Sequence, residues 1–383
     1  MFLEVTLRRN PRLIDAALRL HAEGRVPPNT YVLDLDAIRA NARRVAEAAR
    51  REGIQLYFMS KQLNRNPQVI AAVAGAGIPL GVAVDIDDAR AFREAGVALG
   101  HVGHLVQIPR AFLPQVLSWR PEVMTVFGLA QARAVSEAAV GLGLRQDLLL
   151  RVASGYFHPG QEGGIPLEEL PAVARAIAAL PGVRVAGVTA FPCLLAEDGR
   201  PVPTPNLAAV TRAAELLRDE LGLEACQVNA PSLTCVATLP LLRQAGATHA
   251  EPGHALTGTT PLHAASDQPE LPAMVYLTEV SHTYGGRAYA YGGGSYPRGH
   301  MRNALVGTGL RRAGLRRPGA ENIDYYLALE DPRAREGEPV IAAFRTQAFT
   351  ARANLALVEG VQDGSPKLTG LYDRANRSLD LSI

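Results

Sequence analysis

Between about residue 30 and residue 256, short runs of β-branched and aliphatic residues alternate with longer segments that carry apolar residues at three- and four-residue spacing. The short runs are typical of buried strands, and the longer segments are typical of amphipathic helices. A chain that repeats strand and helix in this way favours a parallel sheet covered by helices. The predicted strands are 31–35, 55–60, 80–84, 100–106, 123–127, 148–152, 183–189, 225–228 and 248–250.

These nine predicted strands are one more than a TIM barrel contains. We place the first of them, 31–35, outside the barrel, so that the barrel strands run from residue 55 to residue 250. A further amphipathic helix, 11–22, precedes Pro27 and Pro28, which prevent its continuation. Asp36 and Asp87 are expected to cap the first and third of the remaining helices, which are predicted at 37–51, 67–74, 88–95, 129–141, 167–180, 206–221 and 233–245.

After about residue 262 the helical periodicity gives way to alternating strands and glycine-rich turns, such as Tyr-Gly-Gly-Arg at 284–287 and Tyr-Gly-Gly-Gly at 291–294. This pattern is typical of an all-β domain. The predicted fold class is therefore α/β: a TIM (β/α)8 barrel over residues 36–262, followed by a C-terminal all-β domain over residues 263–383.

Composition excludes several classes of protein. The chain has 39 basic and 37 acidic residues, a net charge of +2, so nucleic acid is not an expected partner. No apolar run has the length of a signal peptide or a membrane span, and we expect a soluble, cytoplasmic protein. The three cysteines lack CxxC spacing, which argues against a disulfide framework and a zinc site.

Lys61 follows the predicted strand 55–60, and the only other lysine is Lys367. The active site of a TIM barrel lies at the carboxyl ends of its strands, so Lys61 is expected at the barrel mouth. Burial there disfavours the charged amine and leaves a nucleophile that can form a Schiff base with an aldehyde. A surface lysine at a strand end is the alternative interpretation.

A second strand end carries groups that suit a phosphorylated aldehyde. Asn229, Ser232 and Thr234 follow the strand 225–228 and are expected to open a helix, so that hydroxyls and amides would face an anion at its N-terminus. Ordinary helix capping would also explain a serine or threonine at this point.

The next strand end carries Glu251-Pro252-Gly253-His254. Glu251 is expected to point inward, and Gly253 allows a ligand to approach the backbone closely. Alone this run could be a common turn. Its position, directly after a strand that follows the candidate phosphate segment, favours a shared cofactor site that also includes His254.

Four segments, in the order found here, resemble those of the alanine racemases, which are fold type III pyridoxal-phosphate enzymes. They are Asp-Leu-Asp-Ala-Ile-Arg-Ala-Asn at 34–41 followed by Lys61, Arg-Val-Ala-Ser-Gly-Tyr at 151–156, Glu-Pro-Gly-His-Ala-Leu-Thr-Gly at 251–258 and Tyr-Gly-Gly-Gly-Ser-Tyr-Pro-Arg at 291–298. The resemblance covers most of the chain and is greatest to the YhfX-like subgroup.

This resemblance implies several features of the chain as a whole. Pyridoxal 5'-phosphate would be bound through Lys61. The N-terminal helix and strand, residues 1–35, would be associated with the β domain. The protein would form a homodimer with shared active sites.

The resemblance also assigns roles to individual residues. Glu251 occupies the position of the family's arginine that faces the pyridine nitrogen, and a carboxylate there would stabilise a pyridinium and strengthen the electron sink. Arg65 matches the offset of a phosphate-binding tyrosine, although it could equally be an exposed loop charge. His158 falls near an arginine that contacts the cofactor's phenolic oxygen, with an ordinary loop histidine as the alternative.

The second base of the racemases is a tyrosine from the partner subunit's β domain, in a Val-Ser-Tyr-Gly segment. This chain has Val-Ser-His-Thr-Tyr-Gly at 280–285. His282 is our first candidate, because its ordinary pKa lies near neutrality, and Tyr284 is the second. Either residue could instead have a purely structural role in a turn.

These observations favour a pyridoxal-phosphate-dependent amino-acid racemase in which Lys61 and His282 exchange the α-proton. A decarboxylase or lyase of the same fold is an alternative, and a non-catalytic cofactor carrier is another. The amino acid itself is not indicated.

A metal-dependent barrel hydrolase is the alternative from a different class, with candidate ligands near strand ends at Asp85, His101, His104, His249 and His254. Residues three apart in a strand point to opposite faces, so the spacing of His101 and His104 argues against a shared metal site. We therefore predict no metal.

Overall fold

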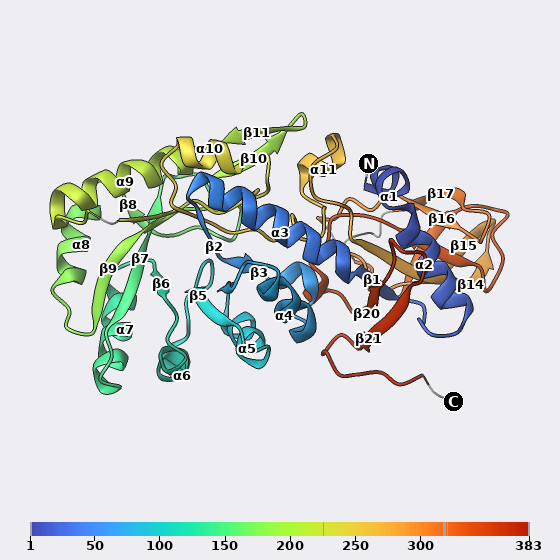
Figure 1. Ribbon diagram of the computed structural model, residues 1–383, viewed down its shortest axis with the longest axis horizontal. Coiled ribbons are helices and arrows are strands. Elements are labelled where there is room, and N and C mark those ends of the chain that lie inside the picture. The colour runs from blue at the N-terminus through green and yellow to red at the C-terminus, as the bar shows by residue number, and fades with distance from the viewer. Residues whose placement is uncertain (1, 225, 297, 317–318, 320, 382–383) are drawn as a thin grey trace. The chain divides into compact units, whose positions relative to one another are not determined.

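The computed structural model describes residues 2–224, 226–296, 298–316, 319 and 321–381 (Figure 1). Ala225 of one predicted strand and Pro297 of the 291–298 segment lie outside the described residues. The chain forms two compact units. Unit 1 comprises Met1–Asn41, Lys61–Asn66 and Leu256–Ile383, and unit 2 comprises Ala42–Ser60 and Pro67–Ala255.

Unit 2 contains the predicted barrel. Two short segments, β2 and β3, together form the first strand, and β2 pairs with β13 while β3 pairs with β4, so that the parallel sheet closes into a ring. The remaining neighbours in the ring are also parallel. The strands are β2 (Gln55–Leu56), β3 (Phe58–Met59), β4 (Leu80–Ala83), β5 (Ala98–Val102), β6 (Val123–Val126), β7 (Gln146–Ala153), β9 (Val183–Thr189), β12 (Gln227–Asn229) and β13 (His249–Ala250).

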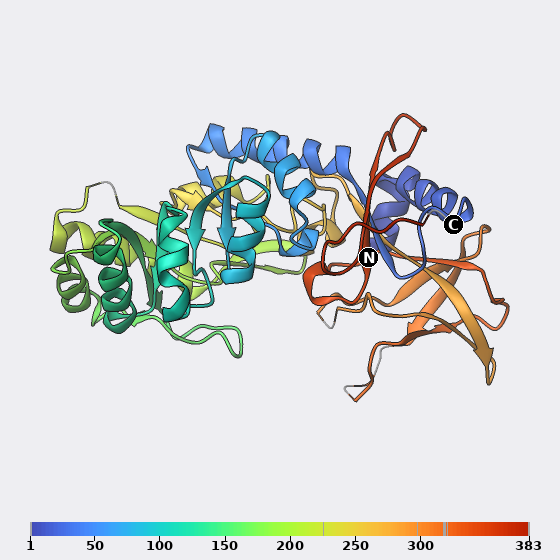
Figure 2. The same cartoon turned by 90° about the horizontal axis from the view of Figure 1, so that it is seen from below.

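Helices lie outside the barrel strands, with α3 before the first strand and the others after that strand or later ones (Figures 1 and 2). They are α3 (Leu35–Glu52), α4 (Pro67–Gly75), α5 (Ile86–Glu94), α6 (Leu113–Ser118), which follows the 3₁₀ turn η2 (Arg110–Phe112), α7 (Leu129–Gly141), α8 (Leu170–Ala178), α9 (Pro205–Leu221) and α10 (Leu239–Gln244). Sequence patterns did not predict α6, the short strand β8 (Ile165–Pro166) or the hairpin of β10 (Leu194–Glu197) and β11 (Arg200–Pro203). The barrel prediction itself is confirmed.

Two predicted helix caps were wrong by two residues. Asp85, not Asp87, caps α5, because its side chain accepts a hydrogen bond from the backbone N–H three residues later at 2.9 Å. Asp34 does the same at the start of α3, at 3.0 Å, whereas Asp36 lies in the first turn. Both sites have the pattern Asp-x-Asp, and in each case the helix begins after the first aspartate.

The barrel interior has an apolar layer beneath a polar one. Tyr57, Val82 and Leu149 belong to a buried cluster drawn from several strands. Because alternate residues of a strand share a face, the residue two positions after Leu149 also points inward, nearer the carboxyl end, and that residue is Arg151. The buried polar residues at this end of the strands are His101, Thr125, Arg151, Thr189, Asn229 and Glu251.

Unit 1 is built on a nine-stranded sheet of order β15-β18-β17-β16-β19-β14-β1-β20-β21. A further pairing of β14 with β15 closes six of these strands into a ring. The first strand of the chain, β1 (Thr30–Asp34), pairs antiparallel with β14 and parallel with β20. The other strands are β14 (Met274–Tyr284), β15 (Arg287–Tyr291), β16 (Asn303–Val306), β17 (Arg311–Arg316), β18 (Tyr326–Glu330), β19 (Pro339–Ala342), β20 (Asn354–Glu359) and β21 (Lys367–Tyr372).

The core of unit 1 lies between this sheet and the N-terminal helices. Leu13 and Leu20 pack with Val32, Val275 and Ile341 in one buried cluster. The predicted helix 11–22 is observed as α2 (Pro11–Ala22), and α1 (Phe2–Arg9) precedes it without having been predicted. The short helical elements of this unit are η1 (Lys61–Leu63), α11 (Pro261–Ala265) and η3 (Ala348–Thr350).

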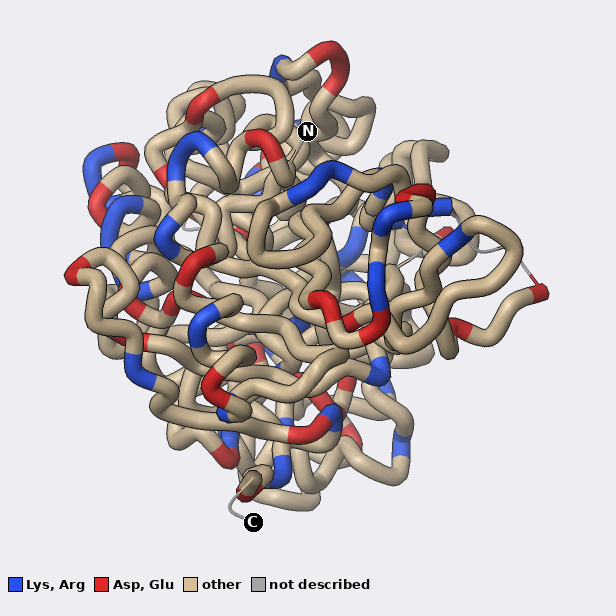
Figure 3. The backbone as a smooth tube through the Cα atoms, turned by 90° about the vertical axis from the view of Figure 1, so that its right-hand side faces the viewer, with Lys and Arg blue, Asp and Glu red and all other residues tan. Residues whose placement is uncertain are grey.

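Basic and acidic residues are interspersed along the backbone, as Figure 3 shows. Among the described residues, none of the helices combines the length and the apolar character needed to cross a bilayer.

Candidate active site

The carboxylate of Glu251 is the centre of the polar layer in the barrel. It follows β13 and its side chain has no exposed surface. His101 Nδ1 lies 2.7 Å from Oε1, and Asn229 Nδ2 donates to the same oxygen at 2.8 Å. His104 Nδ1 lies 3.2 Å from the other oxygen, Oε2. Three strand ends therefore converge on one buried anion.

The surroundings of Glu251 keep it ionised. Burial alone would raise the pKa of this carboxyl, because it disfavours the charged form. The charges of His104 and His101, together with hydrogen bonds from His101 and Asn229, outweigh burial and hold the pKa of Glu251 well below its usual range. Near neutral pH the barrel mouth therefore contains a fixed negative charge.

The chain turns between the two histidines, and this turn corrects the sequence argument against their convergence. Strand β5 ends at Val102, and Gly103 has a φ of +80°, a conformation that glycine adopts without strain. The turn brings the His104 ring within 5.4 Å of the His101 ring, centroid to centroid, in a perpendicular arrangement. Residues three apart can thus share a face when the strand ends between them.

His101, His104 and Glu251 also form a candidate group for a divalent cation, because their ligand atoms lie within 4.8 Å of one another. The prediction that the spacing of His101 and His104 argues against such a group was wrong. The 2.7 Å between His101 Nδ1 and Glu251 Oε1 is nevertheless a hydrogen-bond distance. Two donors on one metal ion usually lie roughly 3 Å or more apart, so the geometry favours a hydrogen-bonded cluster.

The other residues considered as metal ligands do not belong to this group. Asp85 caps α5, and His254 is not a member of the cluster. His249 lies beside Tyr57, with ring centroids 5.2 Å apart, and its Nδ1 is 2.8 Å from Thr248 Oγ1.

His249 makes the stability of the protein depend on pH. Burial, with a contribution from the charge of His101, lowers the pKa of His249 from 6.5 to about 4. The unfolded chain therefore takes up this proton first, so the stabilisation is complete above pH 6.5 and is lost as the pH falls to about 4. His249→Asn, which keeps a hydrogen-bonding nitrogen near Thr248, is expected to remove roughly 3 kcal/mol of pH-dependent stability across this window. Urea unfolding at stepped pH measures this, and parallel curves for variant and wild type would contradict it.

The residues predicted to bind phosphate have different surroundings. Asn229 belongs to the polar layer, where its amide also donates to Thr189 Oγ1 at 3.2 Å. Thr234 Oγ1 accepts a hydrogen bond from the backbone N–H of Glu251 at 3.2 Å. The two predicted segments thus contact each other.

Ser232 departs from its predicted role as the opening of a helix. Its hydroxyl accepts from Leu194 N at 2.9 Å and donates to Leu194 O at 2.7 Å, which fixes the loop against the β10–β11 hairpin. Ser232 and Leu233 have φ values of 94° and 51°, so no right-handed helix can continue through them, and α10 begins only at Leu239. Positive φ at two successive non-glycine residues is costly and occurs mainly at functional sites.

Three other predicted cofactor residues lie in the loops around the polar layer. The His158 ring lies 5.8 Å from that of Phe191, which in turn lies 5.4 Å from the His104 ring. Gly253 is buried directly after Pro252, and His254 is partly buried. His158 therefore belongs to a chain of aromatic contacts that ends at the Glu251 cluster.

Lys61 and Arg65 lie in unit 1, although they follow β3 in the chain. Lys61 begins η1 and is buried, with 9% of its surface exposed. The Arg65 guanidinium stacks over the Phe349 ring at 4.5 Å, and its backbone has a φ of +55°. Arg65 is therefore not a freely solvated loop charge.

The two candidates for the second base differ in how firmly they are held. The His282 ring stacks on Tyr289 at 4.9 Å, with an angle of 5° between the planes, and meets the edge of Tyr326 at 5.0 Å. Tyr284, at the end of β14, is 78% exposed. His282 is therefore oriented by ring contacts within its own unit, whereas Tyr284 is largely exposed.

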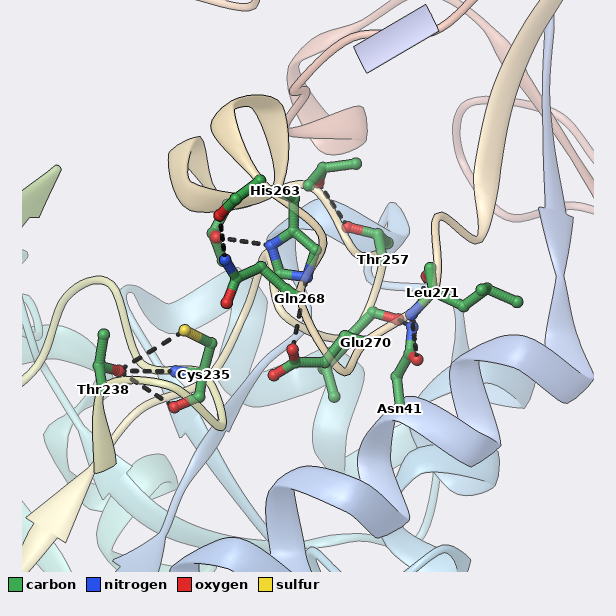
Figure 4. A network of polar contacts seen from close by, with 12 residues as sticks. Asn41, Cys235, Thr238, Thr257, His263, Gln268, Glu270 and Leu271 are labelled. Carbon is green, nitrogen blue, oxygen red and sulfur yellow. Dashed lines mark hydrogen bonds and ion pairs between the residues drawn. The ribbon is translucent and has the colours of Figure 1, made fainter. Parts of the chain in front are cut away.

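A further buried network lies in the segment 256–273 of unit 1 (Figure 4). His263 Nε2 is 3.4 Å from Glu270 Oε2, and its Nδ1 is 2.7 Å from Thr260 Oγ1. Asn41 binds both the N–H and the carbonyl of Leu271, at 2.7 and 2.8 Å. These contacts fasten the segment that leads from α11 into β14.

Four polar residues of the barrel interior were not predicted to belong to this layer, although His104 was named as a candidate metal ligand and Arg151 lies in a family motif. Thr125 Oγ1 lies 2.5 Å from His101 Nε2, Thr189 binds Asn229, and His104 and Arg151 are buried close to the carboxyl ends of β5 and β7. The available signal was a polar residue on the inward face of an otherwise apolar strand.

Known proteins share this architecture. Residues 33–261 match the family model described as alanine racemase, N-terminal domain, and residues 275–368 match the one described as YhfX-like, C-terminal domain. The YhfX protein of Escherichia coli (strain K12) is 44% identical over 390 residues, which span 99% of this chain and 100% of that protein.

Two solved structures are similar in fold at low identity. Alanine racemase of Clostridium difficile 630 in complex with cycloserine has a TM-score of 0.67 and 16% identity, over 91% of this chain and 99% of the racemase. D-Threonine aldolase from Filomicrobium marinum has a TM-score of 0.68 and 18% identity, over 91% of this chain and 95% of the aldolase. The shared fold thus serves more than one reaction.

Proposed function

Because the chain belongs to the pyridoxal-phosphate-dependent alanine racemase family, with a C-terminal domain of the YhfX-like type, we propose that it is an amino-acid racemase. Lys61 would carry the cofactor, and the ionised Glu251 would face its ring nitrogen. The observation that carries this proposal is the buried Glu251 carboxylate, held by three side chains at the carboxyl end of an eight-stranded barrel.

Two features of unit 2 support the fit of this cofactor. Glu251 Oε2 is buried and accepts no hydrogen bond from the described part of the chain, although His104 Nδ1 lies 3.2 Å away. A pyridinium N–H is the donor that such an oxygen lacks. The loops after β12 and β13, the seventh and eighth barrel strands, are where TIM barrels bind phosphate, and they carry Thr234 and Gly253.

Pyridoxal phosphate, when bound, supplies an electron sink that acidifies the α-carbon of an attached amino acid. Glu251 would increase that effect by holding a proton on the ring nitrogen. His101 and Asn229 orient the carboxylate, so its charge is in place before substrate arrives. The buried amine of Lys61 would accept the α-proton on one face.

A racemase needs a second acid–base group on the opposite face. We assign this role to His282 of the partner subunit in a homodimer, with Tyr284 as the alternative. The stacking of His282 on Tyr289 fixes the plane of its ring, which suits proton transfer along a defined direction. Arg65 and His158 would contact the cofactor's anionic groups, in the positions that the sequence resemblance suggests.

A lyase of the same fold is the second candidate. The fixed negative charge at Glu251 favours it as well as racemisation, because a ring nitrogen kept protonated by Glu251 would strengthen the electron sink that both reactions need. A lyase does not have to return a proton to the opposite face of the α-carbon.

One experiment tests the cofactor and the reaction together. The purified protein is incubated with pyridoxal phosphate, scanned in the visible range and reduced with borohydride, and the labelled peptide is mapped. Lys61 is expected to carry the label, and label on Lys367 alone would overturn the proposal. Single amino acids are then incubated with the unreduced protein in D₂O. A racemase introduces deuterium at the α-carbon and yields both enantiomers, whereas a lyase releases an oxo acid or an aldehyde.

A further inference from the structure

Arg151 is a buried cation in the barrel interior that no carboxylate of the described residues neutralises. It lies close to the carboxyl end of β7, and only 1% of its surface is exposed. Among the described residues, no acidic side chain lies within ion-pair distance of its guanidinium. Burial lowers the pKa of Arg151 to about 10, so the side chain remains charged at neutral pH. An isolated buried charge is costly, and proteins seldom retain one without a partner.

The guanidinium makes two contacts that leave most of its donors unused. Nη2 donates to the backbone carbonyl of Gln161 at 2.6 Å, and the guanidinium carbon Cζ lies 4.5 Å from the centre of the Phe127 ring. The buried Nε and Nη1 atoms find no acceptor in the described part of the chain. Three N–H groups of one guanidinium therefore lack an acceptor among the described residues.

The loop 155–164 is shaped to lie against this arginine. A Cβ at Gly164 would come within 2.9 Å of the Arg151 carbonyl oxygen, and a Cβ at Gly163 would come within 3.1 Å of the Phe127 ring. Both glycines have a φ above 120°, which other residues rarely adopt. The Gln161 carbonyl thus holds the loop over a cation whose remaining donors stay unoccupied.

The position of Arg151 in the barrel limits which anion it can serve. It lies on β7, the fifth strand of the ring, whereas the loops suited to phosphate follow the seventh and eighth strands. We infer that Arg151 is an oxyanion-binding residue, and that its ligand is a carboxylate of the amino-acid substrate. This inference rests on the proposed function for the identity of the substrate.

The test uses the protein loaded with pyridoxal phosphate, with succinate as a carboxylate probe and succinamide as its neutral analogue. Wild type is expected to bind succinate, measured by calorimetry and by a rise in melting temperature, and to ignore succinamide. Arg151→Met should weaken succinate binding by about tenfold or more, the loss expected for a charge-assisted hydrogen bond. Arg151→Lys should lose part of the affinity, because it keeps the charge but not the planar fork. Arg133→Met, on the exposed face of α7, is the matched control and should bind as wild type does.

The melting temperatures without ligand separate a binding role from a structural one. Since Met removes an uncompensated buried charge, Arg151→Met should melt at or above the wild-type temperature and lose only the shift caused by succinate. A lower melting temperature, or unchanged succinate affinity, would overturn the inference. If the arginine instead served the cofactor's phenolic oxygen, Arg151→Met would alter the visible spectrum without ligand and leave succinate affinity unchanged. Failure to label Lys61 with pyridoxal phosphate would refute the proposed function, and that result is independent of the succinate measurements on Arg151.

Discussion

Replacing Lys61 with alanine is expected to abolish both the retention of pyridoxal phosphate and the turnover of amino acids. The buried amine is assigned two roles, attachment of the cofactor and removal of the α-proton, and alanine can perform neither. Loss of a positioned base alone costs about 10²- to 10⁴-fold in rate, so the combined loss should leave turnover at the level of free cofactor. Visible spectra after gel filtration and a coupled assay for the opposite enantiomer measure the two effects.

The composition of the chain provides a sharp control for this experiment. Lysine occurs at only two positions, 61 and 367, and Lys367 is exposed at the start of β21. Lys367→Ala should therefore retain cofactor and turnover. Because Lys61 is buried, the melting temperature of Lys61→Ala must also be measured, and only a folded variant counts as a test. A folded Lys61→Ala protein that still racemises amino acids would exclude the proposed role.

The barrel could be predicted from the sequence because its signal is local. A strand such as β9, predicted at 183–189 and observed as Val183–Thr189, is a run of apolar residues bounded by polar turns. Nine predicted strands were one too many for an eight-stranded ring, but the count alone did not show which one lay outside it. The family resemblance indicated the first, and β1 pairs with β14 and β20 of unit 1.

Elements whose boundaries depend on backbone dihedrals were harder to predict. The pattern of apolar residues from 233 to 245 suits one helix, but positive φ values at Ser232 and Leu233 delay its start to Leu239. Hydrophobic spacing carries no information about such values unless glycine occupies the position. The same applies to the caps, where two aspartates at each site are chemically equivalent as acceptors.

The candidate site was predicted in part, for a related reason. Glu251 could be identified because it directly follows a strand. Its partners His101 and His104 lie about 150 positions earlier in the sequence. Both can contact Glu251 because the chain turns at Gly103. Arg151 was identified only as part of a family motif. Strand alternation predicts which polar residues point inward, but not which of them lacks a hydrogen-bond partner.

The Glu251 cluster also explains why a buried carboxylate can stay charged inside the barrel. Its two histidines and one amide offset the cost of removing the charge from water, as the lowered pKa of Glu251 requires. Thr125 and Thr189 in turn contact His101 and Asn229, so each partner is itself oriented. An arrangement with this many supporting contacts is typical of a group whose charge is needed in a fixed position.

Glu251→Gln is expected to cause the second largest loss of turnover. Glutamine has nearly the same shape and can still accept from Asn229, but it cannot hold a proton on the ring nitrogen as a carboxylate does. Removing a preorganised electrostatic partner of this kind typically costs about 10²- to 10³-fold in kcat. The bound cofactor should remain on Lys61, since that attachment does not involve Glu251, and borohydride labelling verifies this. Glu122→Gln, which alters an exposed carboxylate that accepts from Tyr57 at 3.0 Å, is the matched control.

The same variant makes a prediction about acid stability that does not depend on the cofactor. Because the folded state holds the pKa of Glu251 below its unfolded value of 4.5, the carboxylate stabilises the fold above that pH, and this contribution is lost as the pH falls further. Wild type should therefore lose stability more steeply than Glu251→Gln below pH 4.5, in contrast to the His249 variant, whose effect lies between pH 6.5 and about 4. Equal slopes for wild type and Glu251→Gln would mean that the two histidines do not hold this carboxylate in its charged form. Unchanged kcat in a variant that retains the cofactor would in turn place the essential charge elsewhere in the barrel.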